Sequence, residues 1–215
     1  MKISSQISHN GSGILKILEF SFFYKLLQFL LGDAKIYKKF LESIFKEAEN
    51  RTISILDIGC GNGNIVRYLP KSIKYLGYDF NSNYILNAKK LYSNEKIKFE
   101  CIDINIGKLN FDSNFDFVIV IGVLHHLSDE ACRQVFETAI NHLSKGGSLL
   151  TIDPTFVPKQ NAIAKFIISK DRGKSIRTSS QMKNIQSEYF ESIKHSIYNN
   201  LGNIPYNHLF TICKK

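Results

Sequence analysis

The apolar positions of this chain follow two alternating periods. Short apolar runs with the β-branched character of buried strands alternate with stretches whose apolar residues recur every three or four positions, as on one face of a helix. Strands are predicted at Ile53–Asp57, Lys74–Asp79, Lys98–Asp103, Phe115–Ile121, Ser148–Asp153, Tyr189–Tyr198 and Ile204–Cys213. Helices are predicted near Asn64–Leu69, Asn83–Leu91, Asp129–Leu143 and Ala162–Ser169. This order predicts an open, mostly parallel α/β sheet flanked by helices.

Two further helices are predicted before the first strand. Ile14–Leu31 carries a Leu- and Phe-rich stripe at helical spacing, Gly32 ends it, and Asp33 caps a second helix that runs to about Ala48. These two helices form an N-terminal cap that either covers a ligand site or packs on the sheet. A peripheral membrane helix is a third interpretation, because the stripe is aromatic and lysines flank it.

Composition places the protein among ordinary globular chains of one domain. It has 215 residues, of which 44% are hydrophobic and 22% charged. We divide the domain into a helical cap (1–50), a core (51–153) and a closing segment (154–215). The four cysteines are scattered without metal-ligand spacing, so we expect no metal, no disulfide framework and a reducing compartment. The polar N-terminus does not resemble a signal peptide, which favours the cytoplasm.

The positive charge is concentrated near the end of the chain. The formal net charge is +9, and residues 151–215 hold ten Lys and Arg against four Asp and Glu. This excess is typical of a solvated basic face, an anionic small-molecule partner or contact with an anionic membrane surface. No Arg-rich helix or aromatic-basic pattern supports nucleic acid as a partner. The sequence leaves the oligomeric state open.

A glycine-rich turn follows the first strand and carries the strongest functional signal. The stretch from Asp57 to Asn64 reads D-I-G-C-G-N-G-N. A strand, a glycine turn and a helix in this order are typical of a nucleotide-binding corner. The pattern is G-x-G-x-G, and Asn64 occupies the place where a dinucleotide-binding turn has Gly or Ala. Asp57 would repel a phosphate but suit a ligand with ammonium and sulfonium groups.

The stretch LDIGCGNGN resembles the first motif of the class I S-adenosylmethionine (SAM)-dependent methyltransferases. The resemblance implies a Rossmann-like, seven-stranded, mostly parallel sheet with an antiparallel closing strand, and SAM as the cofactor. The ribose hydroxyls would meet Asp79, a role that an acid at the end of the second strand also favours, and its neighbour Phe80 is a further cofactor-binding candidate. The other implied cofactor-binding residues are Asp57, Gly59, Cys60, Gly61, Asn62 and Gly63 at the turn, Asp103 and Ile104 at the adenine, and Gly122 and His125 at the methionine part.

The last third of the chain resembles a bacterial methyltransferase subgroup. The shared stretches are D-P-x-F-V-P from Asp153, D-R-G from Asp171, and I-P-Y-x-H ending at His208. Candidate substrate-binding residues are Asp153, Arg172, Lys174, Arg177 and His208. Arginine suits bidentate contacts with phosphate or carboxylate, although an exposed basic loop is an equal alternative for these basic residues.

Methyl transfer from a sulfonium requires in-line positioning of a nucleophile, and an oxygen nucleophile also needs its proton removed. Histidine suits this task because its pKa lies near neutrality. His125, His126 and His208 are the catalytic candidates; the first two are adjacent, so at most one faces the acceptor, and we favour His125. An alternative is that neither of the adjacent pair is a base.

The function that we predict is SAM-dependent methyl transfer (EC 2.1.1.-) to an oxygen or nitrogen of a small, anionic molecule such as a nucleotide-linked sugar. Two alternatives remain open: a SAM-binding regulatory or scaffold protein without turnover, and a membrane-surface methyltransferase of the lipid or quinone type. The missing dinucleotide glycine argues against a dehydrogenase.

Overall fold

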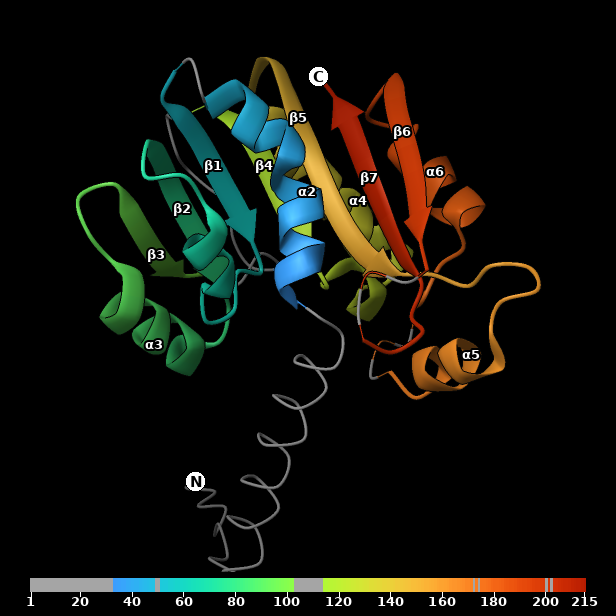
Figure 1. Ribbon diagram of the computed structural model, residues 1–215. Helices are drawn as coiled ribbons and strands as arrows, with labels where there is room; N and C mark the ends of the chain where they lie inside the picture. Colours follow the sequence, from blue (N-terminus) through green and yellow to red (C-terminus); the bar gives the residue numbers. More distant parts are fainter. Residues whose placement is uncertain are drawn as a thin grey trace, which may run out of the picture.

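Seven strands form one twisted sheet (Figure 1). The computed structural model describes residues 33–48, 51–102, 114–171, 173, 175–199, 201 and 203–215. The strands are β1 (Ile53–Ile58), β2 (Ile73–Asp79), β3 (Ile97–Cys101), β4 (Phe115–Ile121), β5 (Leu143–Pro154), β6 (Ser192–Tyr198) and β7 (His208–Lys214). Their order in the sheet is β3-β2-β1-β4-β5-β7-β6. Strands β1 to β5 pair in parallel, and β7 is antiparallel to β5 and β6. The predicted fold class is confirmed.

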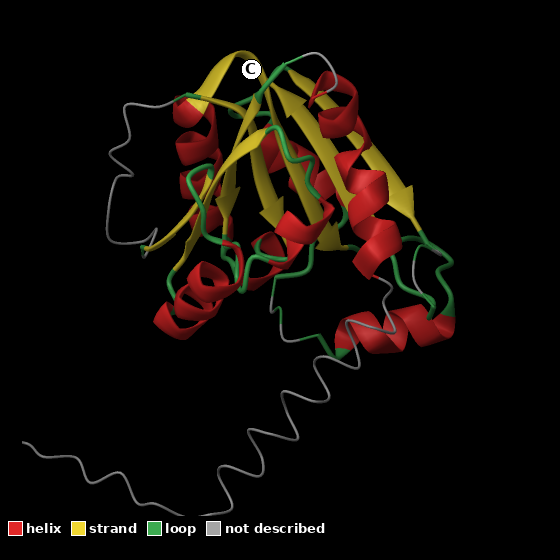
Figure 2. Ribbon diagram, turned by 60° about the vertical axis from the view of Figure 1, so that its left-hand side comes forward, coloured by secondary structure: helices red, strands yellow, loops and turns green. Residues whose placement is uncertain are grey.

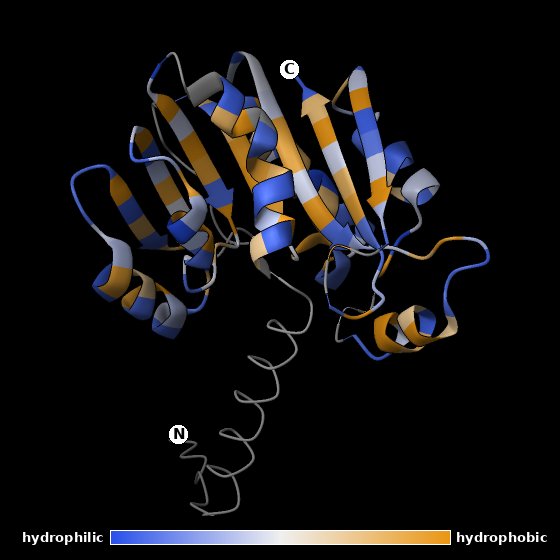
Figure 3. Ribbon diagram, viewed as in Figure 1, coloured by the Kyte–Doolittle hydropathy of each residue, from blue (hydrophilic) through white to orange (hydrophobic). Residues whose placement is uncertain are grey.

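Helices cover both faces of the sheet (Figure 2). On one face lie α2 (Asp33–Ala48) and α3 (Ser82–Tyr92), and on the other lie α4 (Asp129–His142) and α6 (Ser179–Gln186). Each face has its own core, because strands buried on both sides present apolar residues to both layers (Figure 3). The shorter elements are η1 (Asn64–Tyr68), η2 (Leu124–His126) and α5 (Ala162–Ser169).

The structure departs from the predicted elements at three places. Helix α6 was not predicted, although a capping box between Thr178 and Gln181 marks its start. The helix after the glycine turn is a short 3₁₀ helix, η1. Strand β5 begins at Leu143, before the predicted start at Ser148. The predicted helix at 14–31 lies outside the described residues, and no described helix is both long and apolar enough to cross a bilayer.

The register of β1 against β4 is fixed at their first residues. The Asp116 carboxylate accepts hydrogen bonds from the Ser54 N–H and hydroxyl at 2.8 Å each, and from Arg51 at 2.6 Å. This register brings the carboxyl ends of β1 and β4 side by side, where the strand order reverses direction. Open α/β sheets bind their ligands at this switch point. In Figure 1 it is the lower edge of the sheet, between β1 and β4.

Candidate functional site

The glycine turn after β1 is held in a left-handed backbone conformation. Gly59, Gly61 and Gly63 have φ of 77°, 53° and 69°, values that a side chain disfavours. The Gly59 and Cys60 N–H groups both donate to the Tyr78 carbonyl at 2.8 Å. The turn therefore folds back over the end of β2.

Two of these glycines are also required by close packing. A Cβ on Gly59 would lie 2.5 Å from Val123, and one on Gly63 would lie 2.7 Å from the Phe99 ring. A Cβ on Gly61 would meet no atom within 4 Å, so bare backbone faces open space there. Gly61 is therefore the point at which a ligand could lie directly against the turn.

The acid at the end of β2 is tied to the turn. Asp79 accepts hydrogen bonds from Gly61 N–H and Asn81 N–H, both at 2.9 Å, and is 9% exposed. It does not cap α3, because Asn81 does so. A carboxylate has about four lone-pair sites, so Asp79 retains capacity for ligand hydroxyls.

The acid at the end of β1 is almost fully buried. Asp57 is 2% exposed and accepts a hydrogen bond from the Tyr75 hydroxyl at 2.6 Å. Burial raises the pKa of Asp57 to about 7, the Asp79 charge adds to this rise, and the Tyr75 hydrogen bond opposes it. A bound cation nearby would favour the ionised carboxylate.

The remaining predicted cofactor residues surround the turn. Burial strongly raises the pKa of the Cys60 thiol, which is therefore not a nucleophile. The Asn62 side-chain oxygen is buried, and no partner for it is found among the described residues. Phe80 is 76% exposed next to Asp79, and Gly122 follows β4 with φ of 65°. Asp103 and Ile104 lie outside the described residues.

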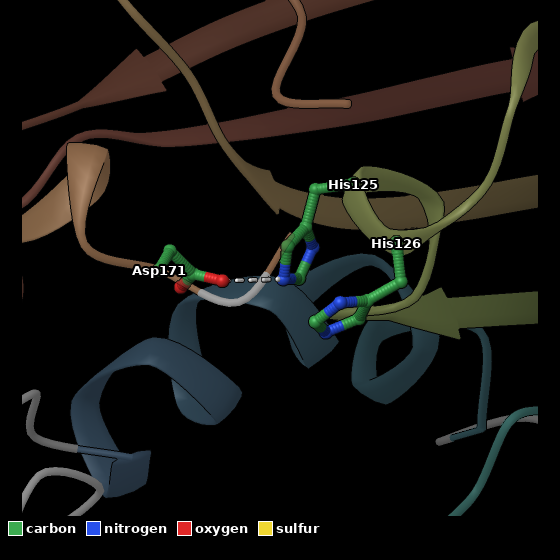
Figure 4. A group of neighbouring side chains, drawn as sticks. All are labelled: His125, His126 and Asp171. Atoms are coloured by element: carbon green, nitrogen blue, oxygen red, sulfur yellow. Dashed lines mark ion pairs between the residues drawn. The ribbon is translucent and has the colours of Figure 1, made fainter. Parts of the chain in front are cut away.

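A second group of side chains lies beyond the ends of β4 and β5, where Asp171 lies beside His125 and His126 (Figure 4). A second carboxylate, Asp153, also contacts His125. His125 Nδ1 lies 2.8 Å from Asp153 Oδ1, which also accepts the His125 backbone N–H at 3.1 Å. His125 Nε2 lies 3.3 Å from Asp171 Oδ1. Asp171 in turn accepts hydrogen bonds from Gly173 N–H and the Tyr206 hydroxyl.

This arrangement does not fit His125 as a free general base. Burial alone would lower the pKa of His125, but the hydrogen bonds and charges of Asp153 and Asp171 raise it to about 9. The same contacts hold the pKa of Asp171 well below its usual range, against the effect of burial. Both ring nitrogens are engaged, and the side chain is 7% exposed. His126 is the exposed member of the pair, with its ring centroid 3.9 Å from that of His125.

His208 lies on β7, opposite Pro154 of β5. It is 6% exposed, and its ring lies 4.9 Å from Tyr206 and 6.4 Å from Phe210 between centroids. Burial lowers the pKa of His208 to about 4, so the ring is neutral at pH 7. Within the described part of the chain its Nδ1 has no hydrogen-bond partner.

Arg177 is held within the fold, and its contacts argue against the predicted role as a ligand for an anion. Its five N–H donors are all used: two bonds go to Asp129, and three go to the carbonyls of Leu124, Leu127 and Ser175. The residue is 6% exposed. The other two basic candidates, Arg172 and Lys174, lie outside the described residues.

Sequence reasoning missed two residues that the structure places at the site, Asp171 and Tyr206. Both fall within the stretches D-R-G and I-P-Y-x-H, in which the basic residues and His208 were the predicted candidates. The predicted substrate residue Asp153 lies in this group, and its Oδ2 is buried without a partner among the described residues. Spacing along the chain also gave no indication that Asp171 lies beside the two histidines.

The sheet order and the glycine turn between acid-ended strands define a Rossmann-like, nucleotide-binding type of fold. Residues 55–147 match a family described as "Methyltransferase domain". The chain is 29% identical over 173 residues to "Putative methyltransferase 235L" of Invertebrate iridescent virus 6, which covers 78% of this chain and 60% of the relative. It is 32% identical over 126 residues to "Malonyl-[acyl-carrier protein] O-methyltransferase" of Bacillus cereus, covering 54% and 45%.

Among solved structures, magnesium protoporphyrin IX methyltransferase from Synechocystis with bound S-adenosylhomocysteine superimposes with a TM-score of 0.65. The sequence identity is 14%, and the match covers 98% of this chain and 90% of that one. Residues 55–147 thus match a methyltransferase domain, in agreement with the resemblance that the motifs indicated, and the chain shares the fold of this solved structure. It spans only 60% and 45% of the two curated relatives named above.

The glycine geometry gives contrasting effects for two Ala substitutions. Gly61→Ala places a methyl group in open space, so we expect a loss of about 1–2 kcal/mol in the free energy of unfolding from backbone strain and a marked loss of cofactor binding. Gly63→Ala adds a collision with Phe99, and we expect a loss of about 2–5 kcal/mol. Urea denaturation and calorimetry would measure both effects. Equal destabilisation by the two changes would contradict this account of the turn.

The structural role assigned to Arg177 predicts a stability defect. Arg177→Met leaves the Leu124 and Leu127 carbonyls without donors, and we expect a loss of about 2–4 kcal/mol in the free energy of unfolding. The control is Arg133→Met, which removes a pair with Glu188 that solvent screens and should leave the free energy of unfolding nearly unchanged. If Arg177→Met kept full stability and lost only activity, the residue would be a substrate ligand after all.

Burial of neutral His208 predicts a specific acid sensitivity. The folded pKa of about 4 lies below the unfolded value of 6.5, so stability is fully present above 6.5 and is lost as the pH falls toward 4. Between pH 7 and pH 4 the wild type should lose roughly 3 kcal/mol more than His208→Gln. Denaturant titrations at a series of pH values would show this, and parallel curves for the two proteins would refute it.

Proposed function

We propose that this protein transfers the methyl group of SAM to an oxygen or nitrogen of a small acceptor molecule. The observation that carries the proposal is the Asp79–Gly61 contact, because it places a carboxylate with free lone pairs beside bare, left-handed backbone. The match of residues 55–147 to a methyltransferase domain supports the same cofactor. The free cysteines support a reducing compartment, and we propose the cytoplasm.

The turn and the strand ends suit the parts of SAM. We propose that Asp79 accepts the ribose hydroxyls, that exposed Phe80 packs beside the nucleoside, and that Gly61 and Asn62 face the methionine part. The Asp57 carboxylate supplies the negative charge that an ammonium or sulfonium group prefers and that a pyrophosphate does not. This charge pattern supports SAM over a dinucleotide.

The acceptor would approach the ends of β4 and β5. In-line displacement needs the acceptor atom roughly 3 Å from the methyl carbon, with water excluded. The paired carboxylates around His125 fix its ring, so we assign His125 a positioning role and propose that His126, the exposed imidazole, faces the acceptor. The Asp153 Oδ2 atom is buried without a partner among the described residues and is available for an acceptor hydroxyl or amine.

We extend the proposal to an anionic acceptor on the basis of charge. Residues 151–215 carry ten basic and four acidic residues, and Arg172 and Lys174 follow Asp171 directly in the chain. Because Arg177 is occupied by the fold, these two residues are the ones that we propose for the anion.

The ribose assignment predicts the effect of changing Asp79. Asp79→Asn should weaken SAM binding by about 1–3 kcal/mol, because the charged acceptor of buried hydroxyls is removed. Calorimetric titration would measure this, with Asp116→Asn at the opposite end of the sheet as the control that keeps wild-type affinity. Unchanged affinity in folded Asp79→Asn would reject the assignment. Transfer of labelled methyl from SAM to candidate acceptors would then test turnover itself.

A further inference from the structure

Three potential metal ligands converge at the ends of β4 and α5. One ligand atom each from His125, His126 and Asp171 lies within 4.8 Å of the others. The two histidines come from η2, and Asp171 comes from the segment after α5, so the fold and not local spacing brings them together (Figure 4).

The central distance already matches that between two ligands of one ion. His125 Nε2 and Asp171 Oδ1 are 3.3 Å apart. Imidazole and carboxylate ligands at about 2.0–2.2 Å from a tetrahedral ion lie about 3.3–3.5 Å from each other. An ion can therefore take the place of the proton that these two groups share, with little movement of either side chain.

The groups behind the ligands have the arrangement that metal sites require. A metal-bound histidine normally donates its other ring nitrogen to a carboxylate, and His125 Nδ1 lies 2.8 Å from the buried Asp153. The Asp171 carboxylate is held by the Gly173 N–H at 2.9 Å and by the Tyr206 hydroxyl at 3.1 Å. A Cβ on Gly173 would collide with the His125 ring, so glycine is needed for this approach.

The charges of the group also favour a cation. Two carboxylates, Asp153 and Asp171, flank one histidine, and the nearby guanidinium of Arg177 is bonded to Asp129 and three carbonyls. One Asp153 oxygen has no partner among the described residues, although the side chain is 2% exposed. A divalent ion would offset this excess of negative charge.

We propose that His125 Nε2, His126 and Asp171 bind one divalent first-row transition metal of the Zn²⁺ and Co²⁺ class. Two imidazoles and one carboxylate suit such ions better than Mg²⁺ or Ca²⁺, which take mainly oxygen ligands. Three protein ligands leave at least one coordination position open, on the side of exposed His126, where an acceptor oxygen could bind. The metal site goes beyond the proposed methyl transfer and does not depend on it.

The test is a metal titration of the untagged 215-residue chain after treatment with a chelator. Co²⁺ should bind at one site per chain with a dissociation constant in the micromolar range or below. Binding should produce the visible d–d absorption of a low-coordinate imidazole site, and Zn²⁺ should displace it. His126→Asn changes an exposed residue and should weaken binding at least about 10-fold, as should Asp171→Asn. His195→Asn, on edge strand β6, is the control that should bind as the wild type does.

A third variant distinguishes a metal site with a supporting carboxylate from chance binding by surface histidines. Asp153→Asn keeps all three ligands but removes the outer carboxylate, and it should weaken Co²⁺ binding about 10- to 100-fold. Circular dichroism would verify that each variant is folded. Wild-type affinity in His126→Asn or Asp171→Asn, or no Co²⁺ binding by the wild type below millimolar concentration, would overturn the proposal. Either result would leave the SAM titration, and so the proposed function, unaffected.

Discussion

The site depends on a stretch of backbone that only glycine can supply. Between β1 and η1 the chain takes three left-handed residues within five positions, two of them pressed against Val123 and Phe99. This tight course lets the Tyr78 carbonyl and the Asp79 carboxylate bind the turn from the end of β2. The acids at the ends of β1 and β2 and the bare backbone of Gly61 are thereby brought to one edge of the sheet.

A second constraint organises the ends of β4 and β5. His125 joins Asp153 of β5 to Asp171 of the segment after α5, and Arg177 joins that same segment to the carbonyls of η2 and its C-cap. The closing segment of the chain is therefore connected to η2 by charge-assisted contacts and not by apolar packing alone. A change in the occupancy of the His125–Asp171 contact, by a proton or by a metal ion, would act directly on η2.

The fold was predictable from the sequence because its signals are local. Buried strands such as Phe115–Ile121 and the glycine turn can each be recognised from a few consecutive residues. The order of these elements then restricts the topology of the sheet. Helix α6 was not predicted because it is short and mostly polar, although its Thr178–Gln181 capping box is present in the sequence.

The roles of individual side chains were less predictable, because they depend on partners distant in the chain. The guanidinium group of Arg177 suits an anion, yet its N–H donors bind Asp129 and backbone carbonyls that no sequence pattern identifies. His125 has the position of a catalytic base, yet two carboxylates from β5 and from the segment after α5 enclose it. Long-range pairing of polar groups decided both cases, and hydrophobic periodicity carries no information about it.

Side-by-side calorimetric titration of the protein with SAM, S-adenosylhomocysteine and NAD is the most direct measurement of the central claim. The acid-ended strands and the G-x-G-x-G turn predict micromolar binding of the first two ligands and no binding of NAD. Binding of NAD alone would contradict the account, because it would mean that the turn accepts a pyrophosphate beside Asp57 and Asp79.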